Sequence, residues 1–360
     1  MNTRRRVISP AKALFVGPTP ATGAHTTGNI KQLRRLQNLE YSFNISRQDV
    51  AQYGQLAPID RVSLEPPTVT LSTSYLITDV INERALGFTT NAGVSVLSGI
   101  LAGSEDEKNY FILTVDEGSD ANGFAANSGS VIGIGNGFLN NYSIEASVGG
   151  FPTVSFAVEG LNMEGYSDPS GEFLPAVNPQ NGIRVTGQTF TLPQATANAG
   201  SGQPSALRPG DISLNLGGTG SAKFVDFSGI SIQSFNCSFD LARESIQALG
   251  YKYARSKEIQ FPINVNFSVD ILAGDMPVGS IGDLLCEEDN NDFIVTMRQP
   301  DCAGTGDIAL QLNINNCKLE SQNWSSSIGP AETVSISWIA QIGSFQDTSN
   351  GLFMSGVTSY

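Results

Sequence analysis

Apolar and polar residues alternate with a period of two along four segments of the chain. In residues 39–45, 69–75, 235–241 and 263–271 the odd positions are almost all apolar and the even positions are polar. This alternation is typical of antiparallel strands that bury one face and expose the other to water. Frequent glycine and proline, and the lack of a long stretch at helical period, indicate a mainly β fold.

The chain also repeats itself. Residues 39–50 read closely against residues 235–246, at an offset of 196 positions (239 − 43), and at this offset Gly54 meets Gly250. Residues 109–115 match 291–297 at an offset of 182 (291 − 109), and residues 153–156 match 333–336 at 180 (333 − 153). Three blocks in one order favour a duplication over generic β patterning. The falling offset places extra residues in the first copy, chiefly in 82–93, which has no clear counterpart.

The repeat predicts two tandem β-sandwich or barrel domains of the α+β type, each with a short helix. We expect an N-terminal arm, two copies of one tube-type domain, a connector rich in Gly, Pro, Ser and Asn, and a C-terminal tail. The boundaries are 1–10 for the arm, 11–162 for copy 1, 163–208 for the connector, 209–346 for copy 2 and 347–360 for the tail. Within the connector, residues 187–192 are expected to form a short strand.

Helix signals occur at two places in each copy. Ser46 followed by Asp49 resembles an N-cap with an acid three residues on, and Gly54 suits a helix end, so we expect a turn or two of helix at the tip of a long hairpin. Residues 243–249 before Gly250 repeat this arrangement. A second short helix is expected at 94–101 and at 278–285, each followed by an acidic run that we interpret as a solvated face.

The composition argues against a protein that grips nucleic acid. The formal net charge of the 360 residues is −14, whereas tight binding of nucleic acid requires Lys and Arg to neutralise phosphates. A protein that encloses nucleic acid without holding it remains compatible with this charge. The four cysteines match no zinc spacing and are expected to be buried free thiols. Without a signal peptide or a membrane-length apolar run, the chain is expected to be soluble and cytoplasmic when made.

Few residues suggest chemistry. His25 is the single histidine, so no Ser-His-Asp or Cys-His arrangement can form in the second half. Residues 133–137 superficially resemble a nucleotide loop but lack the following GK[ST], which favours a mobile β connection. The acidic runs lack the spacing of an EF-hand. A carboxylate pair for glycoside chemistry stays open, because such pairing is spatial. The sequence therefore predicts no enzyme activity, no metal and no cofactor.

The matched blocks resemble the tube domain of bacteriophage tail tube (major tail) proteins. The residues that carry the resemblance are the strand–turn–strand of 39–79, notably Phe43 to Gln48 with Gly54, and its second copy in 234–262. These are patterns of fold rather than catalytic signatures. The connector and the unmatched residues 82–93 depart from the family pattern.

The resemblance implies rings of six domains that stack into a hollow tube, with three fused chains per ring. The implied partners are further copies of this chain and other phage tail proteins, with genomic DNA enclosed but not specifically bound and no membrane contact. The protein would belong to the virion tail, assembled in the host cytoplasm. The resemblance also implies that the hairpin tips reach the neighbouring ring, through Arg47, Gln48, Gly54, Arg243, Glu244 and Gly250.

The polar faces of the alternating strands carry almost no Lys or Arg. A conduit that must release DNA should be hydrophilic and lack clustered cations. As a hypothesis, the lumen is lined by Ser42, Asn44, Ser72, Ser238, Asp240, Asn264, Asn266 and Asp270. The same pattern also fits an ordinary solvent-facing sheet.

Two other classes of structural protein are compatible with this composition. One is another ring component of the tail, such as a terminator or distal-tail protein. A second is a tandem β-sandwich carbohydrate-binding or adhesin module, which should show clusters of exposed Trp and Tyr. The chain has two tryptophans, and Trp338 falls at a core-type position.

Overall fold

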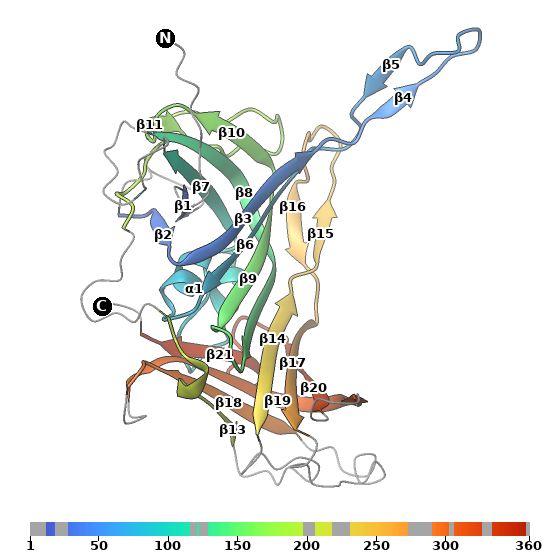
Figure 1. Ribbon diagram of the computed structural model, residues 1–360. Helices are drawn as coiled ribbons and strands as arrows, with labels where there is room; N and C mark the ends of the chain where they lie inside the picture. Colours follow the sequence, from blue (N-terminus) through green and yellow to red (C-terminus); the bar gives the residue numbers. More distant parts are fainter. Residues whose placement is uncertain are drawn as a thin grey trace.

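The expected mainly β fold is confirmed by the computed structural model, in which the described residues form long antiparallel strands with two short α-helices (Figure 1). The structure describes residues 12–18, 28–115, 121, 129–196, 206–217, 231–272, 290–301, 306–325 and 333–357. Outside these ranges lie the arm at 1–10, His25, Cys286, Cys302, the helix expected at 278–285 and the acidic run that follows it.

The first half consists of two sheets that share one long strand. Its elements are β1 (Lys12–Pro18), β2 (Lys31–Leu33), β3 (Leu36–Asn44), β4 (Gln48–Val50), β5 (Asp60–Val62), β6 (Thr68–Leu76), α1 (Ile81–Leu86), α2 (Ser98–Leu101), β7 (Glu107–Val115), β8 (Gly129–Ser147), β9 (Thr153–Gly160) and β10 (Asn162–Tyr166). The beginning of β8 pairs with β7 and β10, and its end pairs with β9, which continues to β6 and β3. The strand passes from one sheet to the other near Asn136, whose φ of 51° is left-handed.

The second half has the same pairing order. Its elements are β13 (Ile212–Gly217), β14 (Ile232–Asp240), β15 (Arg243–Ile246), β16 (Ser256–Ile259), β17 (Ile263–Leu272), β18 (Asn291–Arg298), β19 (Ile308–Ser325), β20 (Thr333–Ile342) and β21 (Gly351–Gly356). Here β19 takes the place of β8: its beginning pairs with β18 and β21, and its end pairs with β20, which continues to β17 and β14. Because β21 joins this sheet, the paired structure extends past residue 346.

The register corrects one block of the sequence match. Ile314 of β19 is the counterpart of Ile134 of β8, at the offset of 180 (314 − 134). Phe293 lies opposite Ile314, and Tyr110 lies opposite Ile134. Phe293 therefore corresponds to Tyr110 and not to Phe111. A slip of one residue exchanges the two faces of a strand. The sequence could not resolve it because β7 is buried on both faces and lacks the alternation that would fix the register.

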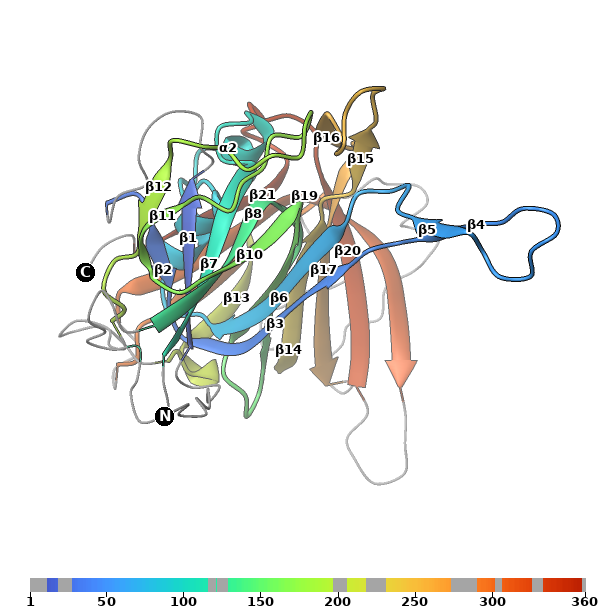
Figure 2. The ribbon, with the colours of Figure 1, turned by 90° about the horizontal axis from the view of Figure 1, so that it is seen from above.

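The two halves are joined edge to edge by β14 and the end of β8. The register runs antiparallel from Ser234 opposite Ser147 to Asp240 opposite Asn141. The result is one continuous sheet in the order β3, β6, β9, β8, β14, β17, β20 and β19 (Figure 2). A single hydrophobic core draws on both halves beneath this sheet. We name these eight strands the long sheet.

The connector covers the side of β7 that faces away from the main core. It contains β11 (Ser170–Phe173) and β12 (Thr189–Thr191), and a 3-10 turn at Pro209–Asp211 follows it. Phe190 packs against Phe111 with ring centroids 4.5 Å apart, and a second apolar cluster forms around this pair. Strand β12 lies within the range 187–192, where a short strand was expected.

The expected mobile glycine connection at 133–137 is wrong, because these residues lie inside β8. Their glycines allow the connector to approach the strand. A side chain on Gly135 would overlap the backbone of Pro175, and one on Gly133 would meet the Tyr166 ring. The glycine-rich pattern therefore reflects close backbone packing and not mobility.

The helices expected at the two hairpin tips are also wrong. Strands β4 and β5 form a hairpin that projects from the body, and β15 and β16 form a second hairpin beside β8 (Figure 1). Gly54 and Gly250 have φ of 89° and 87°, a conformation that serves a tight turn as well as a helix end. In contrast, α2 occupies the second half of the range 94–101, where a helix was expected.

The substitution Gly135→Ala is expected to lower the free energy of unfolding by about 1–3 kcal/mol, because the added methyl group overpacks β8 against Pro175. Urea denaturation measures this loss. Gly165→Ala in β10 is the control, since a side chain there would meet nothing within 4 Å. Equal losses in the two variants would contradict this explanation.

Candidate functional site: the polar face of the long sheet

The long sheet presents one polar face across both halves of the chain. All eight residues expected to line a lumen lie on this face, on β3, β6, β14 and β17, and all are exposed or half-buried. Ser238 lies directly opposite Asn266, and Asp240 continues the row toward Asn141 of β8. Because β14 pairs with β8, the two sets predicted from separate halves form one surface.

Sequence reasoning missed the members of this face that lie on β8, β9, β19 and β20. They are Asn141, Ser143, Glu145, Thr153, Ser155, Ser321, Asn323, Ser335 and Ser337. The period-two pattern of β20, with Val334, Ile336 and Trp338 buried, could have identified this strand. No signal in the sequence could have shown that β9 and β8 complete the face between β6 and β14, or that β20 and β19 extend it beyond β17.

Short side chains on the face bind one another across neighbouring strands. The hydroxyl oxygens of Ser42 and Thr70 are 2.8 Å apart, as are those of Ser143 and Ser155. The Ser234 hydroxyl donates to Asp270 at 2.5 Å. Such pairs satisfy hydroxyl groups locally and leave a hydrophilic surface on which most side chains are short.

Formal charge on this face is mainly negative. Glu40, Glu145, Asp240 and Asp270 occupy face positions, and Glu159 lies at the end near the hairpins. Lys318, beside Ile339, is the single Lys or Arg at a face position of the described strands. Negative groups of this kind repel a polyanion over a Debye length of about 8 Å at physiological salt.

The second hairpin is fixed to the first half by two ion pairs. Arg243 binds Asp106 at 2.5 Å, and Lys257 binds Glu159 at 2.5 Å. Both cations also lie over the ring of Phe138, at 5.1 and 5.3 Å from its centroid. Side-chain burial of Arg243 and Lys257 makes these contacts stronger than exposed ion pairs.

The residues predicted at the hairpin tips therefore separate into two groups. Arg243 lies at the base of its hairpin, with a side chain only 5% exposed. The other five predicted tip residues are exposed, and they are Arg47, Gln48, Gly54, Glu244 and Gly250.

The acidic run at 105–107 is not a simple solvated face. Glu105 binds Lys108, and Asp106 binds Arg243. Glu107 accepts a 2.7 Å hydrogen bond from Asn136, and burial raises the pKa of this carboxyl. The run thus anchors the second hairpin and the bend of β8.

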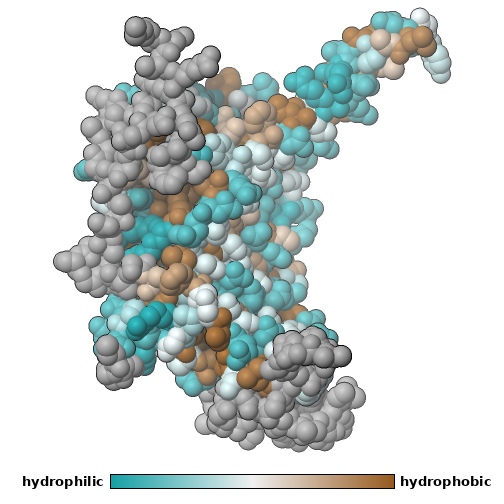
Figure 3. Space-filling view, in the orientation of Figure 1, coloured by the Kyte–Doolittle hydropathy of each residue, from teal (hydrophilic) through white to brown (hydrophobic). Residues whose placement is uncertain are grey.

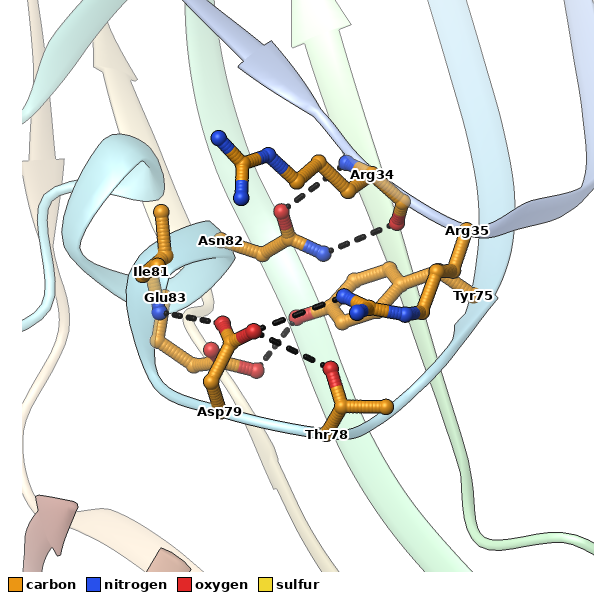
Figure 4. Close-up of polar contacts among 8 residues, drawn as sticks. All are labelled: Arg34, Arg35, Tyr75, Thr78, Asp79, Ile81, Asn82 and Glu83. Atoms are coloured by element: carbon orange, nitrogen blue, oxygen red, sulfur yellow. Dashed lines mark hydrogen bonds and ion pairs between the residues drawn. The ribbon is translucent and has the colours of Figure 1, made fainter. Parts of the chain in front are cut away.

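A separate polar cluster fixes α1 to the sheet (Figure 4). The side chain of Asn82 accepts from the backbone N–H of Arg34 and donates to its carbonyl, both at 3.0 Å. Asp79 accepts from the Ile81 N–H at 2.9 Å and from the Thr78 hydroxyl at 3.0 Å. These bonds satisfy the start of a short helix and tie it to the chain between β2 and β3.

Glu83 is the most perturbed carboxyl of this cluster. It is fully buried and accepts from the Tyr75 hydroxyl at 2.6 Å and from the Tyr142 hydroxyl at 3.1 Å. Burial raises its pKa to about 7, against the lowering effect of the tyrosine bonds. Its second oxygen has no hydrogen-bond partner in the described structure. Because it is closed to solvent, we assign Glu83 a role in positioning α1 against β6 and β8.

Within the described ranges, no three His, Cys, Asp or Glu side chains are grouped to hold a metal ion. None of the helices described is long and apolar enough to span a bilayer. Cys237 and Cys317 are buried and free, as expected for these two residues.

Comparisons with known proteins give limited information. No protein-family model and no curated protein matches the chain. Among solved structures, a match is found to a chain described as the tail of an empty GTA particle, computed with helical refinement and C6 symmetry. It covers 38% of this chain and 95% of the other, at 14% identity and a TM-score of 0.26. A TM-score this low does not establish a shared fold.

The buried carboxyl of Glu83 predicts a specific pH dependence of stability. Its pKa is about 7 in the folded state and near 4.5 when exposed, so the folded chain holds the extra proton and stability falls as pH rises from 4.5 through 7. Glu83→Gln should remove about 3 kcal/mol of this fall. Chemical denaturation at pH 5 and pH 8 gives the change in the free energy of unfolding with pH, which is compared between the wild-type protein and Glu83→Gln. Glu145→Gln, a substitution at an exposed position, is the control and should keep the wild-type change in stability with pH. The same change in Glu83→Gln as in the wild-type protein would contradict this role of Glu83.

Proposed function

We propose that this chain is a non-enzymatic structural protein of a phage virion, one that forms the stacked rings of a tail tube. The observation that supports this proposal is the polar face, with a mainly negative formal charge, that continues across eight strands of both halves. A monomer needs no such joint surface, whereas a channel wall needs a continuous one. In this proposal the two halves are copies of one tube unit, and three chains supply the six units of a ring.

The dimensions are compatible with a DNA conduit. Three chains with eight strands each contribute 24 strands to the wall. At a spacing of about 4.8 Å these enclose a ring about 37 Å across at the backbone, or wider where strands tilt. The short side chains of the polar face leave much of this width open to a DNA duplex.

The chemistry of the face favours passage over binding. Duplex DNA carries one charge about every 1.7 Å, and each phosphate neutralised by Lys or Arg adds salt-sensitive adhesion. Ser, Thr and Asn at face positions hydrate the wall, and Asp240 and Asp270 repel phosphates. DNA would therefore be enclosed without specific contacts.

The first test is direct imaging. Negative-stain micrographs of the purified protein are expected to show rings or hollow tubes with an apparent sixfold outline. A protein that stays monomeric at high concentration, with or without other tail components, would contradict a tube function. Rings that never stack would instead favour another ring component of the tail.

The second test changes the charge of the channel wall. Replacing Asp240 and Asp270 with Lys is expected to slow DNA ejection from assembled particles while rings still form, because the new cations would bind phosphates. Glu172→Lys, on β11 of the connector, introduces a cation away from the polar face and should leave ejection unchanged. Unaltered ejection in the Asp240 and Asp270 variant would count against the lumen assignment.

A further inference from the structure

The long sheet ends in two open edges. At one end, β3 pairs with β6, and at the other, residues 319–325 of β19 pair with β20. Neither edge has a second strand neighbour among the described residues. An open edge presents unpaired backbone N–H and C=O groups to any strand that fits it.

The junction inside the chain shows what fits these edges. Strand β14 occupies in the second half the position that β3 occupies in the first, and it is β14 that pairs with β8. The end of β19 corresponds to the end of β8, since Asn323 lies opposite Ser335 as Ser143 lies opposite Ser155. A strand placed on β19 as β14 lies on β8 would therefore be a β3 strand.

Burial supports the correspondence. Phe239 of β14 is 1% exposed and stacks on Tyr142 of β8, whereas Phe43 at the same position of β3 is 58% exposed. Ile144 of β8 is fully buried, whereas Trp324 at the same position of β19 is 56% exposed. Both edges thus leave core-facing side chains uncovered that the internal junction buries.

The hairpins give a second, independent observation. Beside Asn136 and Phe138, the β15–β16 hairpin and the first half line a concavity of about 300 Å³. The corresponding place in the second half, lined by Asn316, Lys318, Ile339 and Gln341, is a concavity of about 500 Å³. The hairpin that would match it, β4–β5, projects from the body (Figure 3). Tyr53 and Leu56, between these two strands, are fully exposed.

We infer that the partner of both open edges is a second copy of this chain, joined in the register of the internal junction. The inference rests on the proposed ring. Strand β3 of one chain pairs antiparallel with the end of β19 in the next, placing Tyr41 opposite Trp324, Ser42 opposite Asn323 and Phe43 opposite Gln322. The β4–β5 hairpin then seats laterally on the 500 Å³ concavity of the same neighbour, within one ring, and not on the ring above as the resemblance implies.

A designed disulfide tests the register. Opposed residues of antiparallel strands have Cα atoms about 4.5–5.5 Å apart, within the range that a disulfide spans. The variant Ser42→Cys with Asn323→Cys, in a background with Cys286→Ser and Cys302→Ser, is expected to oxidise into covalent dimers and trimers. Ser143→Cys with Ser238→Cys repeats the design at the internal junction and should link within one chain. Thr70→Cys with Asn323→Cys, one strand further from the edge, should not link.

The outcomes separate this inference from the proposed function. Rings in micrographs, an internal link at Ser143 and Ser238, and no link between Ser42 and Asn323 would overturn the register and leave the ring intact. An absence of rings together with an absence of links would overturn both. Links without rings would support the junction and contradict the tube.

Tryptophan fluorescence gives a second measurement. On assembly, the covered Trp324 should shift its emission to shorter wavelength, and Trp324→Phe should abolish the shift because Trp338 is already buried. Persistence of the shift in Trp324→Phe would contradict burial of this edge.

Discussion

Backbone pairing between β14 and the end of β8 is the interaction on which the rest of the molecule depends. It merges two four-stranded surfaces into the long sheet and brings the cores of both halves together. Tyr142 and Phe239 stack across it at 5.5 Å, and Phe88 contacts both rings edge-on. Without this pairing the polar faces would belong to separate surfaces, and neither could serve as part of a common wall.

The two halves are alike in pairing order but differ in what surrounds them. The first half carries the connector on its outer side, and the segment with α1 and α2 reaches the second half, where the Val96 N–H donates to the Leu352 carbonyl. The residues 82–93 that lacked a sequence counterpart supply Glu83 and Phe88 to this region. The unmatched part of the first half therefore reinforces the joint between halves.

Much of the fold could be predicted from the sequence, and the reasons for the failures are physical. The period-two strands β14 and β17 gave the correct faces, since each has one buried side and one side that is exposed or half-buried. The block at Tyr110 was one residue out of register because both faces of β7 are buried. The tips at Gly54 and Gly250 were misread because a left-handed glycine ends a helix and turns a hairpin equally well. The pairing of Asp106 with Arg243 joins residues far apart in sequence, and no local pattern encodes it.

The open edges of the long sheet affect how an assembly of these chains would stop growing. Each chain that joins through a head-to-tail contact covers one edge and contributes another, so an incomplete arc stays as adhesive as a single chain. Only a circle has no edge left. Termination would then come from geometry and not from a capping factor, and a small error in the angle of each joint would produce an endless spiral in place of a ring.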